Sequence, residues 1–582
     1  MALDPGLEDS SSLRCSPMQG VMASVIRTMF ASRWRIQTLA VVILLALAIH
    51  TLRSLRDIAG ADADNRYSLL KWLGPFHSKP EARPPFSLPP EYDQFLERAV
   101  PQSDFCTERF TPKFLDGFRT HAIQYCAAGS PASLHCFHSH TRDDGRTVDS
   151  LCIGQGARLD VARQTFALDC QVRRPDSDET SRGLIPFDAI RAEWYDSGPR
   201  WVLDHWVRAE RDPSKAAAAG AAGGHGSPEF ILLVKRECST NIWHCMMEIW
   251  SMTMTFDLLR TTPDPSRDGD NSSYFADGPD LPNTQLVILD EHDDGNFLDL
   301  WTIFTRKPLI RFKHLLSNPE HARAFAETPR NIIIPLAGAA NPVWQNDWVD
   351  RECRYAPMLY AFVDRVLRFY GLPSGEDKAE AKAKANPVVA AHSHDASPPM
   401  INLTYIDRTG NRRLLDHDKL LAAVVAKYPH VRAQSVDLAT LSFAEQLRLV
   451  RETDILLGVH GAGLTHTMFM RNGHGAVVEI RPASNDYRGF KNLAFMKGLH
   501  YFTAHGEQVP VGKGGGGEQQ KPKRGIGARV TQSSERGGNQ TLGLEKRDSW
   551  HWDDVRIGAE EFMGLMDAAI SSLSSNPHTR RY

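Results

Sequence analysis

The segment from Arg451 to Pro482 constrains the fold of this chain more than any other stretch. Residues 455–459 are an apolar run without charge, which predicts a strand buried on both faces. The sequence His-Gly-Ala-Gly follows at 460–463, where the glycines allow close backbone approach and a turn at positive φ. Residues 464–470 favour a short helix, and residues 476–480 favour a second buried strand. This order predicts a parallel βαβ unit whose turn lies at the ligand-binding edge of the sheet.

The turn of this unit is surrounded by polar side chains at the ends of otherwise apolar elements. His460 and Thr465 flank the glycines, and Glu479 lies near the end of the second strand. A turn of this kind is often only structural, but the first backbone N–H groups of a helix also suit a phosphate. The binding candidates in this segment are therefore His460, Gly461, Ala462, Gly463, Thr465 and Glu479.

Length and charge restrict the class of protein. The 582 residues are enough for two or three domains. The 67 Lys and Arg residues nearly balance the 70 Asp and Glu residues, so no polybasic surface argues for a nucleic-acid partner. We therefore expect a multidomain globular protein that does not bind nucleic acid.

One segment near the N-terminus has the composition of a membrane span. Residues 36–52 are mostly apolar, although this length is marginal for a bilayer that needs about 20 residues. Arginines, but no acidic residues, occur between positions 14 and 35, which predicts a cytosolic tail at 1–35 and a type II signal anchor rather than a cleaved signal peptide. Proline pairs in residues 53–101 predict an extended stem. The globular portion is then expected in the lumen of the Golgi or endoplasmic reticulum.

The cysteines agree with an oxidising compartment. Eight of the nine follow the predicted span, and this even number predicts up to four disulfides whose connectivity cannot be deduced. The absence of a C-x-x-C pair argues against a zinc site. The glycosylation sequons are at Asn271, Asn402 and Asn539, although Asn402 begins a predicted buried strand.

Two groups of polar residues stand out in the predicted N-terminal domain, residues 102–373. A buried strand at 230–235 runs into a helix that begins near Asn241, and His244 shares a face of that helix with Asn241. Such a pair can position a hydroxyl group for deprotonation, although a helix cap and a packed histidine would produce the same pattern.

The second group is acidic and follows a predicted strand at 284–289. Asp290 and Asp294 could bind a metal or a sugar, or could simply be solvated. The D-x-D triplets at 62/64, 176/178 and 268/270 lie in polar stretches where such triplets arise by chance. We therefore predict no metal site.

A charged, alanine-rich linker at 374–398 is expected to precede a C-terminal domain at 399–582. Alternating strands and helices there predict a parallel sheet covered by helices on both faces. Arg408 and Arg412 follow a strand at 401–406 and could hold a diphosphate bidentately, unless they form a solvated turn. The Gly-, Lys- and Gln-rich insertion at 508–546 is expected to be disordered.

Several stretches of the chain resemble glycosyltransferase family 61. They are STNIWHCMMEIW, VILDEHDDGNFLDLW, LTYIDRTGNRRLLDHDKL, GVHGAGLTHTMFM, NLAFMKGLHYFTAH and AEEFMGLM. The resemblance implies an α/β fold of the GT-B type, with two Rossmann-like domains that face a cleft and the nucleotide in the C-terminal one. It also implies inverting transfer from a UDP-sugar without a metal or another cofactor.

The resemblance implies roles for the candidate residues as well. Arg408 and Arg412 would hold the diphosphate beside the His-Gly-Ala-Gly turn, and Glu479 would hold ribose hydroxyls. The candidates for the base that takes the acceptor proton are His244, Asp290 and Asp294, with Asn241 as a positioning group.

The expected activity is transfer of N-acetylglucosamine from UDP-GlcNAc to Ser or Thr hydroxyls of secretory-pathway proteins. A UDP-xylose-dependent β-1,2-xylosyltransferase acting on N-glycans or polysaccharide is an alternative, because the shape of the sugar pocket decides between donors. A non-catalytic lumenal binding protein of the same fold is a second alternative. The expected partners are a nucleotide sugar, a protein or glycan acceptor, and the membrane.

Overall fold

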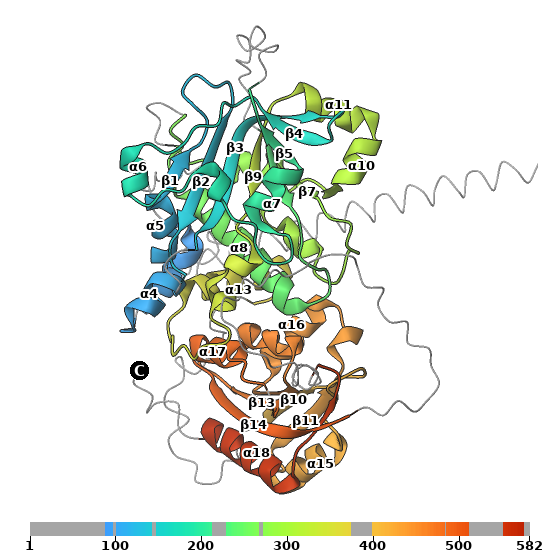
Figure 1. Ribbon diagram of the computed structural model, residues 1–582. Coiled ribbons are helices and arrows are strands. Elements are labelled where there is room, and N and C mark those ends of the chain that lie inside the picture. The colour runs from blue at the N-terminus through green and yellow to red at the C-terminus, as the bar shows by residue number, and fades with distance from the viewer. Residues whose placement is uncertain are drawn as a thin grey trace, which may run out of the picture. The chain divides into compact units, whose positions relative to one another are not determined.

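The computed structural model describes eight ranges of the chain (Figure 1). They are 88–96, 100–142, 147–211, 229–266, 272–373, 399–483, 485–510 and 551–574. All of them lie in one compact unit, Pro84–Tyr582. The predicted cytosolic tail, the span at 36–52, the linker at 374–398 and most of the stem lie outside these ranges. Within the ranges, no helix has both the length and the apolar character needed to cross a bilayer.

The first sheet combines parallel and antiparallel strands. Its parallel part has the order β9-β6-β7-β8, and β3, β2 and β1 continue it beyond β9 as antiparallel strands. Its strands are β1 Ala122–Gln124, β2 Ser133–Ser139, β3 Asp149–Asp160, β4 Thr165–Leu168, β5 Val207–Ala209, β6 Phe230–Val234, β7 Thr284–Ile288, β8 Ile310–Arg311 and β9 Arg330–Ile334. The expected parallel strands are thus present in this half, but β1, β2 and β3 make the sheet a mixed one. The connections between β1, β2 and β3 are shorter than the dozen or so residues that a parallel crossover needs.

The second sheet is parallel except at one edge. Its order is β11-β10-β12-β13-β14-β15, and only β15 is antiparallel to its neighbour. Its strands are β10 Ile401–Ile406, β11 Val431–Val436, β12 Ile455–Val459, β13 Ala476–Pro482, β14 His500–Val509 and β15 Asp554–Arg556. The predicted parallel sheet of this half is thus confirmed.

Both sheets contain a point where the strand order reverses. In the second sheet, β11 lies on one side of β10 and β12 lies on the other. In the first sheet, β7 lies on one side of β6 and β9 lies on the other. Open α/β sheets bind ligands beyond the carboxyl ends of the strands at such a point. The loops that follow β6, β9, β10 and β12 are therefore the places where this fold can build a site.

The helices on one face of the second sheet share a hydrophobic core with the first half. The largest core cluster includes residues of α8 (Ile242–Arg260) and α13 (Pro357–Phe369) together with residues of α16 (Phe443–Glu452), η10 (Ala462–Phe469) and α17 (Gly489–Met496). On the opposite face, the sheet packs against α15 (His417–Lys427) and α18 (Ala559–Ser574) (Figure 1). The two sheets thus belong to one packed unit, and the GT-B arrangement remains a prediction.

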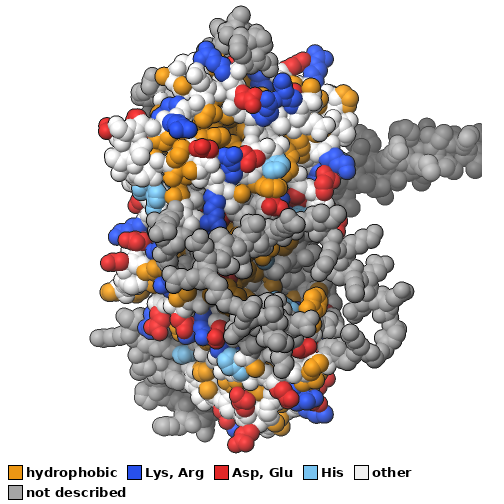
Figure 2. Space-filling view, viewed as in Figure 1, with side chains coloured by type: hydrophobic (Ala, Val, Ile, Leu, Met, Phe, Trp, Pro, Cys, Tyr) orange, Lys and Arg blue, Asp and Glu red, His pale blue; other side chains and the backbone are white. Residues whose placement is uncertain are grey.

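The remaining α-helices are short and lie mostly in the first half. They are α3 Asp93–Leu96, α4 Asp104–Phe110, α5 Lys113–Thr120, α6 Ser177–Ser181, α7 Gly198–His205, α9 Asp277–Asp280, α10 Phe312–Ser317, α11 Pro319–Glu327 and α12 Pro342–Gln345. On the face shown in Figure 2, acidic and basic side chains are interspersed over the described surface. Those residues of this face therefore create no extended field of one sign.

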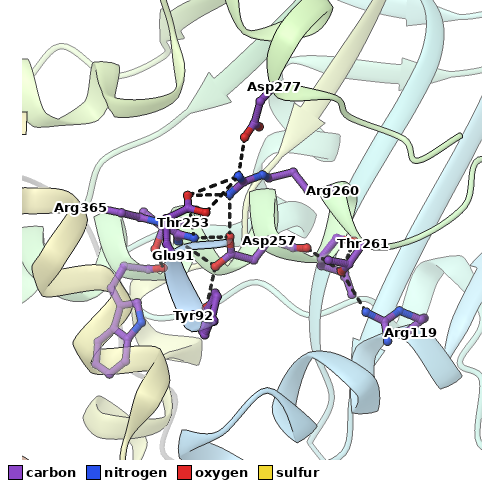
Figure 3. Close-up of polar contacts among 11 residues, drawn as sticks. Glu91, Tyr92, Arg119, Thr253, Asp257, Arg260, Thr261, Asp277 and Arg365 are labelled. Atoms are coloured by element: carbon purple, nitrogen blue, oxygen red, sulfur yellow. Dashed lines mark hydrogen bonds and ion pairs between the residues drawn. The ribbon is translucent and has the colours of Figure 1, made fainter. Parts of the chain in front are cut away.

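A buried ion network connects α8 to the segment that precedes the first sheet (Figure 3). The Asp257 carboxylate accepts two hydrogen bonds from Arg365, at 2.8 and 2.7 Å, and one from the hydroxyl of Tyr92 at 2.7 Å. Arg260 lies 3.2 Å from Glu91 and also pairs with Asp257. Burial of charge is tolerated here because each group has a partner of opposite sign.

This network corrects the predicted stem. Tyr92 is almost fully buried, so residues 88–96 belong to the folded unit and not to an extended tether. The proline-rich sequence predicts an extended chain. In the structure, Tyr92 instead hydrogen-bonds Asp257 and Glu91 pairs with Arg260, and these contacts hold the segment on the core of the first half.

Three disulfides form in the first half. They are Cys106–Cys353, Cys126–Cys170 and Cys136–Cys152. Cys238 and Cys245 carry free thiols, so the predicted maximum of four is not reached. The pair Cys136–Cys152 bridges directly opposed positions of β2 and β3.

Local signals in the second half located its elements well. Strand β10 begins and ends where the sequence predicts, and Ser442 and Glu445 form a capping box at the start of α16. The predicted boundary of the disordered insertion, residue 508, is placed too early, because Gln508 and Val509 still belong to β14 and pair with β15. Residues 511–546 lie outside the described ranges.

Candidate functional site

Arg408 and Arg412 lie against the backbone of Gly461. The loop that follows β10 brings both arginines to the carboxyl end of β12. A β-carbon at position 461 would lie 2.5 Å from Nη1 of Arg408 and 3.4 Å from Nη1 of Arg412. Arg412 also donates from Nη1 to the carbonyl oxygen of His460, at 3.0 Å. The structure therefore brings together the two arginines and the His-Gly-Ala-Gly turn, at the reversal point of the second sheet.

Close contact, and not backbone conformation, explains the glycines of this turn. Gly461 has a φ of 162°, which is extended backbone that any residue adopts. Gly463 is tightly packed as well, because a β-carbon there would lie 3.1 Å from Cγ2 of Ile406. The predicted turn at positive φ is therefore wrong, whereas the predicted close approach is confirmed.

The arginine loop is held in a defined conformation. Arg408 donates from Nε to the carbonyl oxygen of Asn411 at 2.9 Å. Arg412 has a φ of 56°, a left-handed conformation that is uncommon for residues other than glycine. Arg413, the next residue, forms an ion pair with Asp554 at 2.6 Å. Of the three arginines in this stretch, Arg413 is thus neutralised by a carboxylate, and the other two lie at the turn.

The two arginines at the turn oppose each other electrostatically. Burial lowers the pKa of Arg408. Burial and the charge of Arg408 together lower the pKa of Arg412 to about 10. Both guanidinium groups remain protonated at neutral pH, so two positive charges are held close together with reduced access to water. A bound anion would relieve this repulsion.

His460 is fixed by a carboxylate beneath it. Its Nδ1 lies 2.6 Å from Oε1 of Glu479, and the hydroxyl of Tyr501 donates to the other carboxylate oxygen. Glu479 is fully buried. Protein groups thus engage both oxygens of Glu479, and its contact with ribose stays a prediction.

Ala462 and Thr465 belong to η10, which begins directly after the turn. Thr465 is fully buried, and its hydroxyl makes no hydrogen bond with a described residue. His466, beside it, contacts the carbonyl oxygen of Gly463 and the side chain of Gln446, and burial lowers its pKa to about 4. His466 is therefore a neutral structural histidine, whereas the hydroxyl of Thr465 is not used by the protein.

On the first sheet, His244 contacts a carboxylate that sequence reasoning missed. Nδ1 of His244 lies 3.2 Å from Oε2 of the buried Glu237. The other oxygen of Glu237 accepts a hydrogen bond from Ser197 Oγ at 3.3 Å. Glu237 follows β6 and His244 lies in the first turn of α8, so only the turn between strand and helix brings them together.

Asn241 is the N-cap of α8. Its Oδ1 accepts a hydrogen bond from the backbone N–H of Trp243 at 3.0 Å. The capping explanation of this asparagine is thus confirmed, and such a cap stabilises a helix by about 1 kcal/mol. The cap also fixes the first turn, in which His244 lies.

Asp290 and Asp294 are both engaged by arginines. Asp290 is buried and accepts hydrogen bonds from Arg236, at 2.7 Å from the backbone N–H and 2.8 Å from Nη2. Asp294 is largely exposed and forms an ion pair with Arg311. Both carboxylates are thus occupied by guanidinium groups of the protein. Of the three predicted base candidates, His244 therefore fits the role best.

Aromatic rings connect His244's helix to the turn of the second sheet. Trp243 lies edge-on to Tyr487 at 5.8 Å and to Phe490 at 5.6 Å between ring centroids. The ring of His460 lies 5.1 Å from Tyr487 and 5.5 Å from Phe490. One aromatic cluster therefore contacts both the first turn of α8 and the His-Gly-Ala-Gly turn.

Asp347 is a second acidic residue that sequence reasoning missed. The hydroxyl of Tyr487 hydrogen-bonds its side chain, and Arg488 donates its backbone N–H to the Asp347 carbonyl oxygen at 2.6 Å. Burial raises the pKa of Asp347 to about 7. Its surrounding sequence, NPVWQNDW, contains no periodic signal that would mark this position.

The described residues contain no group of three or more His, Cys, Asp and Glu side chains that could hold a metal ion. Asp176, in one of the D-x-D triplets, caps α6 through a hydrogen bond from the backbone of Glu179. The triplets at 62/64 and 268/270 lie outside the described ranges.

Comparison with known proteins covers the same region. Residues 242–477 match the family model described as Glycosyltransferase 61. EGF domain-specific O-linked N-acetylglucosamine transferases are among the similar curated proteins. That of Drosophila melanogaster is 27% identical over 284 residues, which are 48% of this chain and 45% of the relative. That of Rattus norvegicus is 30% identical over 349 residues (59% and 53%), and that of Pan troglodytes is 36% identical over 238 residues (40% and 39%).

The chain spans about half or less of the length of these relatives. The matched family segment begins at the first residue of α8 and ends within β13. It thus contains His244, the arginine loop and the His-Gly-Ala-Gly turn. Residues 242–477 of this chain are therefore similar to glycosyltransferase family 61.

Proposed function

We propose that this chain is an inverting glycosyltransferase that moves N-acetylglucosamine from UDP-GlcNAc to Ser or Thr hydroxyls of secretory-pathway proteins. The family match supports sugar transfer, and the names of the relatives motivate the donor sugar and the protein acceptor. Three disulfides support an oxidising compartment. The proposal includes membrane attachment through residues 36–52.

The arginine pair at the turn is the observation that carries this proposal. Arg408 and Arg412 are close to Gly461, partly desolvated and at the reversal point of a parallel sheet. Guanidinium groups bind diphosphate oxygens with paired hydrogen bonds. A diphosphate bound here would also receive backbone N–H groups from the start of η10.

The reaction needs one displacement at the anomeric carbon. The acceptor oxygen forms a bond to that carbon while the bond from the carbon to the diphosphate oxygen breaks, and a base takes the hydroxyl proton. Negative charge grows on the departing diphosphate. Arg408 and Arg412 would stabilise that charge, which is the task that a cation performs in metal-dependent transferases. The proposal therefore requires no metal.

Nucleotide binding and transfer test the proposal separately. The full chain in detergent is heated with UDP, UDP-GlcNAc or UDP-xylose, each with and without EDTA, because a ligand that binds only the folded state raises the melting temperature. Transfer is then measured by mass spectrometry on a refolded EGF-like domain, with the anomeric configuration of the product read by NMR. The variant Arg408→Ala is compared with Arg413→Ala, whose arginine is paired with Asp554.

The expected result is stabilisation by UDP and UDP-GlcNAc that survives EDTA and is lost in Arg408→Ala only. Transfer of N-acetylglucosamine with inversion would establish the donor and acceptor. A larger shift and transfer with UDP-xylose would replace the donor in this proposal. If no nucleotide stabilises the protein, the transferase proposal is wrong and a binding role on this fold is left.

A further inference from the structure

The buried carboxylate of Glu237 is built into the first sheet at its reversal point. Glu237 follows β6, and Gly338 follows β9, the strand on the other side of the reversal. A β-carbon at Gly338 would lie 3.0 Å from Oε1 of Glu237 and 2.6 Å from Cγ of Glu248. The loop after β9 thus packs directly on this carboxylate. Such a position, in an open α/β sheet, is where ligand-binding and catalytic groups gather.

Two buried acids meet at this point, and they differ in what they contact. Glu248 accepts a hydrogen bond at Oε1 from the backbone N–H of Glu237, at 2.9 Å. Burial raises the pKa of Glu248 well above its usual range. Burial also raises the pKa of Glu237, but its contact with His244 acts in the opposite direction. Of the two acids, Glu237 is therefore the one whose side chain contacts the imidazole ring of His244.

The contact with Glu237 selects one arrangement of the His244 ring. A carboxylate accepts hydrogen bonds, so the ring nitrogen beside it, Nδ1, must donate. A neutral imidazole then has no proton on Nε2, which is free to accept one. No described protein group is hydrogen-bonded to Nε2 of His244 in this structure.

The rings of Tyr195 and Trp344 both pack against His244, and their own centroids lie 6.2 Å apart. The ring centroid of Tyr195 lies 4.9 Å from that of His244, and the ring of Trp344 lies 4.4 Å from it. Tyr195 is 56% exposed. Its φ of 61° is left-handed, a conformation that costs about 1 kcal/mol or more for such a residue. Strain that places an exposed ring beside a histidine indicates a functional role for that ring.

The turn that carries Tyr195 is anchored to the same carboxylate. Ser197 Oγ contacts Oε1 of Glu237 at 3.3 Å and donates to the carbonyl oxygen of Trp194 at 2.9 Å. The Lys235 ammonium donates to the carbonyl oxygen of Tyr195 at 2.6 Å. The exposed ring and the orientation of His244 are therefore coupled through Glu237.

We propose that Glu237 is a positioning residue that holds a proton on Nδ1 of His244, so that Nε2 takes the proton of an acceptor hydroxyl bound beside the exposed ring of Tyr195. This inference rests on the proposed transfer reaction. As the acceptor oxygen bonds to the anomeric carbon and the diphosphate oxygen departs, the hydroxyl proton moves to Nε2. The Glu237 carboxylate stabilises the imidazolium, which later loses its proton to water.

Steady-state kinetics test the positioning role. Glu237→Gln keeps the size of the side chain, but its amide can donate to Nδ1 and carries no charge. We expect kcat to fall about 100-fold, within the usual contribution of a general base, while the KM for UDP-GlcNAc stays within twofold. Glu327→Gln on α11, where the glutamate is exposed and pairs with Arg323, is the matched control and should behave as wild type. A decrease in kcat of less than threefold for Glu237→Gln would overturn the role.

The ring of Tyr195 has its own test with a refolded EGF-like domain as the acceptor. Tyr195→Ala should raise the KM for this acceptor about fivefold without changing the KM for UDP-GlcNAc, because an aromatic contact is worth roughly 1 kcal/mol, which is about fivefold in an equilibrium constant. Tyr195→Phe retains the ring and should retain the wild-type KM. Equal values for the Ala and Phe variants would exclude Tyr195 from the acceptor site.

The tautomer of His244 can be measured without any sugar or acceptor. The full chain is labelled with ¹³C-histidine, the signal of His244 is assigned by its absence in His244→Gln, and the ¹³Cδ2 shift reports which nitrogen carries the proton. The expected tautomer is Nδ1–H in the wild type, with a change in Glu237→Gln. A wild-type ring protonated on Nε2 alone would overturn the inference. If the wild type shows Nδ1–H but transfers no sugar, the proposed function fails while the role of Glu237 in orienting His244 stands.

Discussion

Arg408 is in direct contact with Gly461: a β-carbon at position 461 would lie 2.5 Å from Nη1 of the arginine. The contact places a partly desolvated guanidinium at the end of β12, beside a second guanidinium whose pKa is lowered to about 10. Two like charges are kept together by the protein without a ligand. The free energy of this repulsion becomes available for binding when an anion enters.

The close contact predicts the effect of adding one methyl group. Gly461→Ala should displace the guanidinium of Arg408 and weaken UDP binding about tenfold or more, which a titration followed by thermal shift or calorimetry would measure. Gly410→Ala, in the loop that carries Arg408, is the control, because a β-carbon at Gly410 meets no atom within 4 Å. Equal affinities for both variants would show that the nucleotide does not bind at this turn.

Removing the charge of Arg412 should raise the stability of the unliganded protein and weaken its binding of UDP. Arg412→Gln keeps a donor for the His460 carbonyl but removes the charge that opposes Arg408. We expect the free energy of unfolding without ligand to rise by about 1 kcal/mol, while stabilisation by UDP is largely lost. Arg413→Gln removes the ion pair with Asp554 and should lower stability slightly while the UDP shift persists. Chemical denaturation with and without UDP distinguishes these outcomes.

The buried network around Asp257 should be required for folding of the first half. Arg365→Met leaves the Asp257 carboxylate without its two shortest charged contacts. A buried charge stripped of its partner typically costs about 3–5 kcal/mol. Arg323→Met breaks an exposed pair with Glu327 and should cost less than about 1 kcal/mol. Urea denaturation of the two variants checks the difference, and similar losses would show that the network has no special role.

Asp347 should make stability depend on pH in a definite direction. Burial raises its folded-state pKa to about 7 from the usual value near 4, so the folded protein holds this proton more tightly than the unfolded chain. Its contribution to stability is therefore greatest at low pH, falls between about pH 4 and pH 7, and is constant above pH 7.

The variant Asp347→Asn cannot ionise and should avoid this loss. Its free energy of unfolding relative to wild type should rise by about 2 kcal/mol between pH 5 and pH 8, measured by denaturant titrations at each pH. Asp350→Asn, at a half-exposed carboxylate three residues further on, reports the effect of replacing a surface acid. A difference between Asp347→Asn and wild type that does not change with pH would contradict the burial argument.

The parts of the fold that are encoded locally could be predicted from the sequence. Apolar runs located β10, β12 and β13. Arg408 and the His-Gly-Ala-Gly turn were both identified, because each directly follows a recognisable strand. Strand pairing was less accessible. No local sequence pattern identifies which strands pair in the antiparallel part, β1 to β3, or which cysteines form the three disulfides.

The candidate site was predicted only where a residue lies next to a strong local signal. His244 met that condition, but its partner Glu237 lies seven residues away across a strand-to-helix turn, and Asp347 lies in a stretch without periodicity. The predicted stem is wrong at Tyr92 for a related reason. This side chain is held in the folded unit by a hydrogen bond to Asp257, which is 165 residues away in the sequence.

The amino-acid sequence by itself determined which segments are buried, where helices and strands begin, and which phosphate-binding chemistry the chain can offer. These features depend on backbone preferences and side-chain burial within a few residues. Only the tertiary structure decided which charges have partners: Asp290 is neutralised by Arg236, Arg413 by Asp554, and His244 faces Glu237. Whether a side chain can bind a ligand or take a proton depends on groups a few ångströms away in space, and the chain path, not the local sequence, brings those groups together.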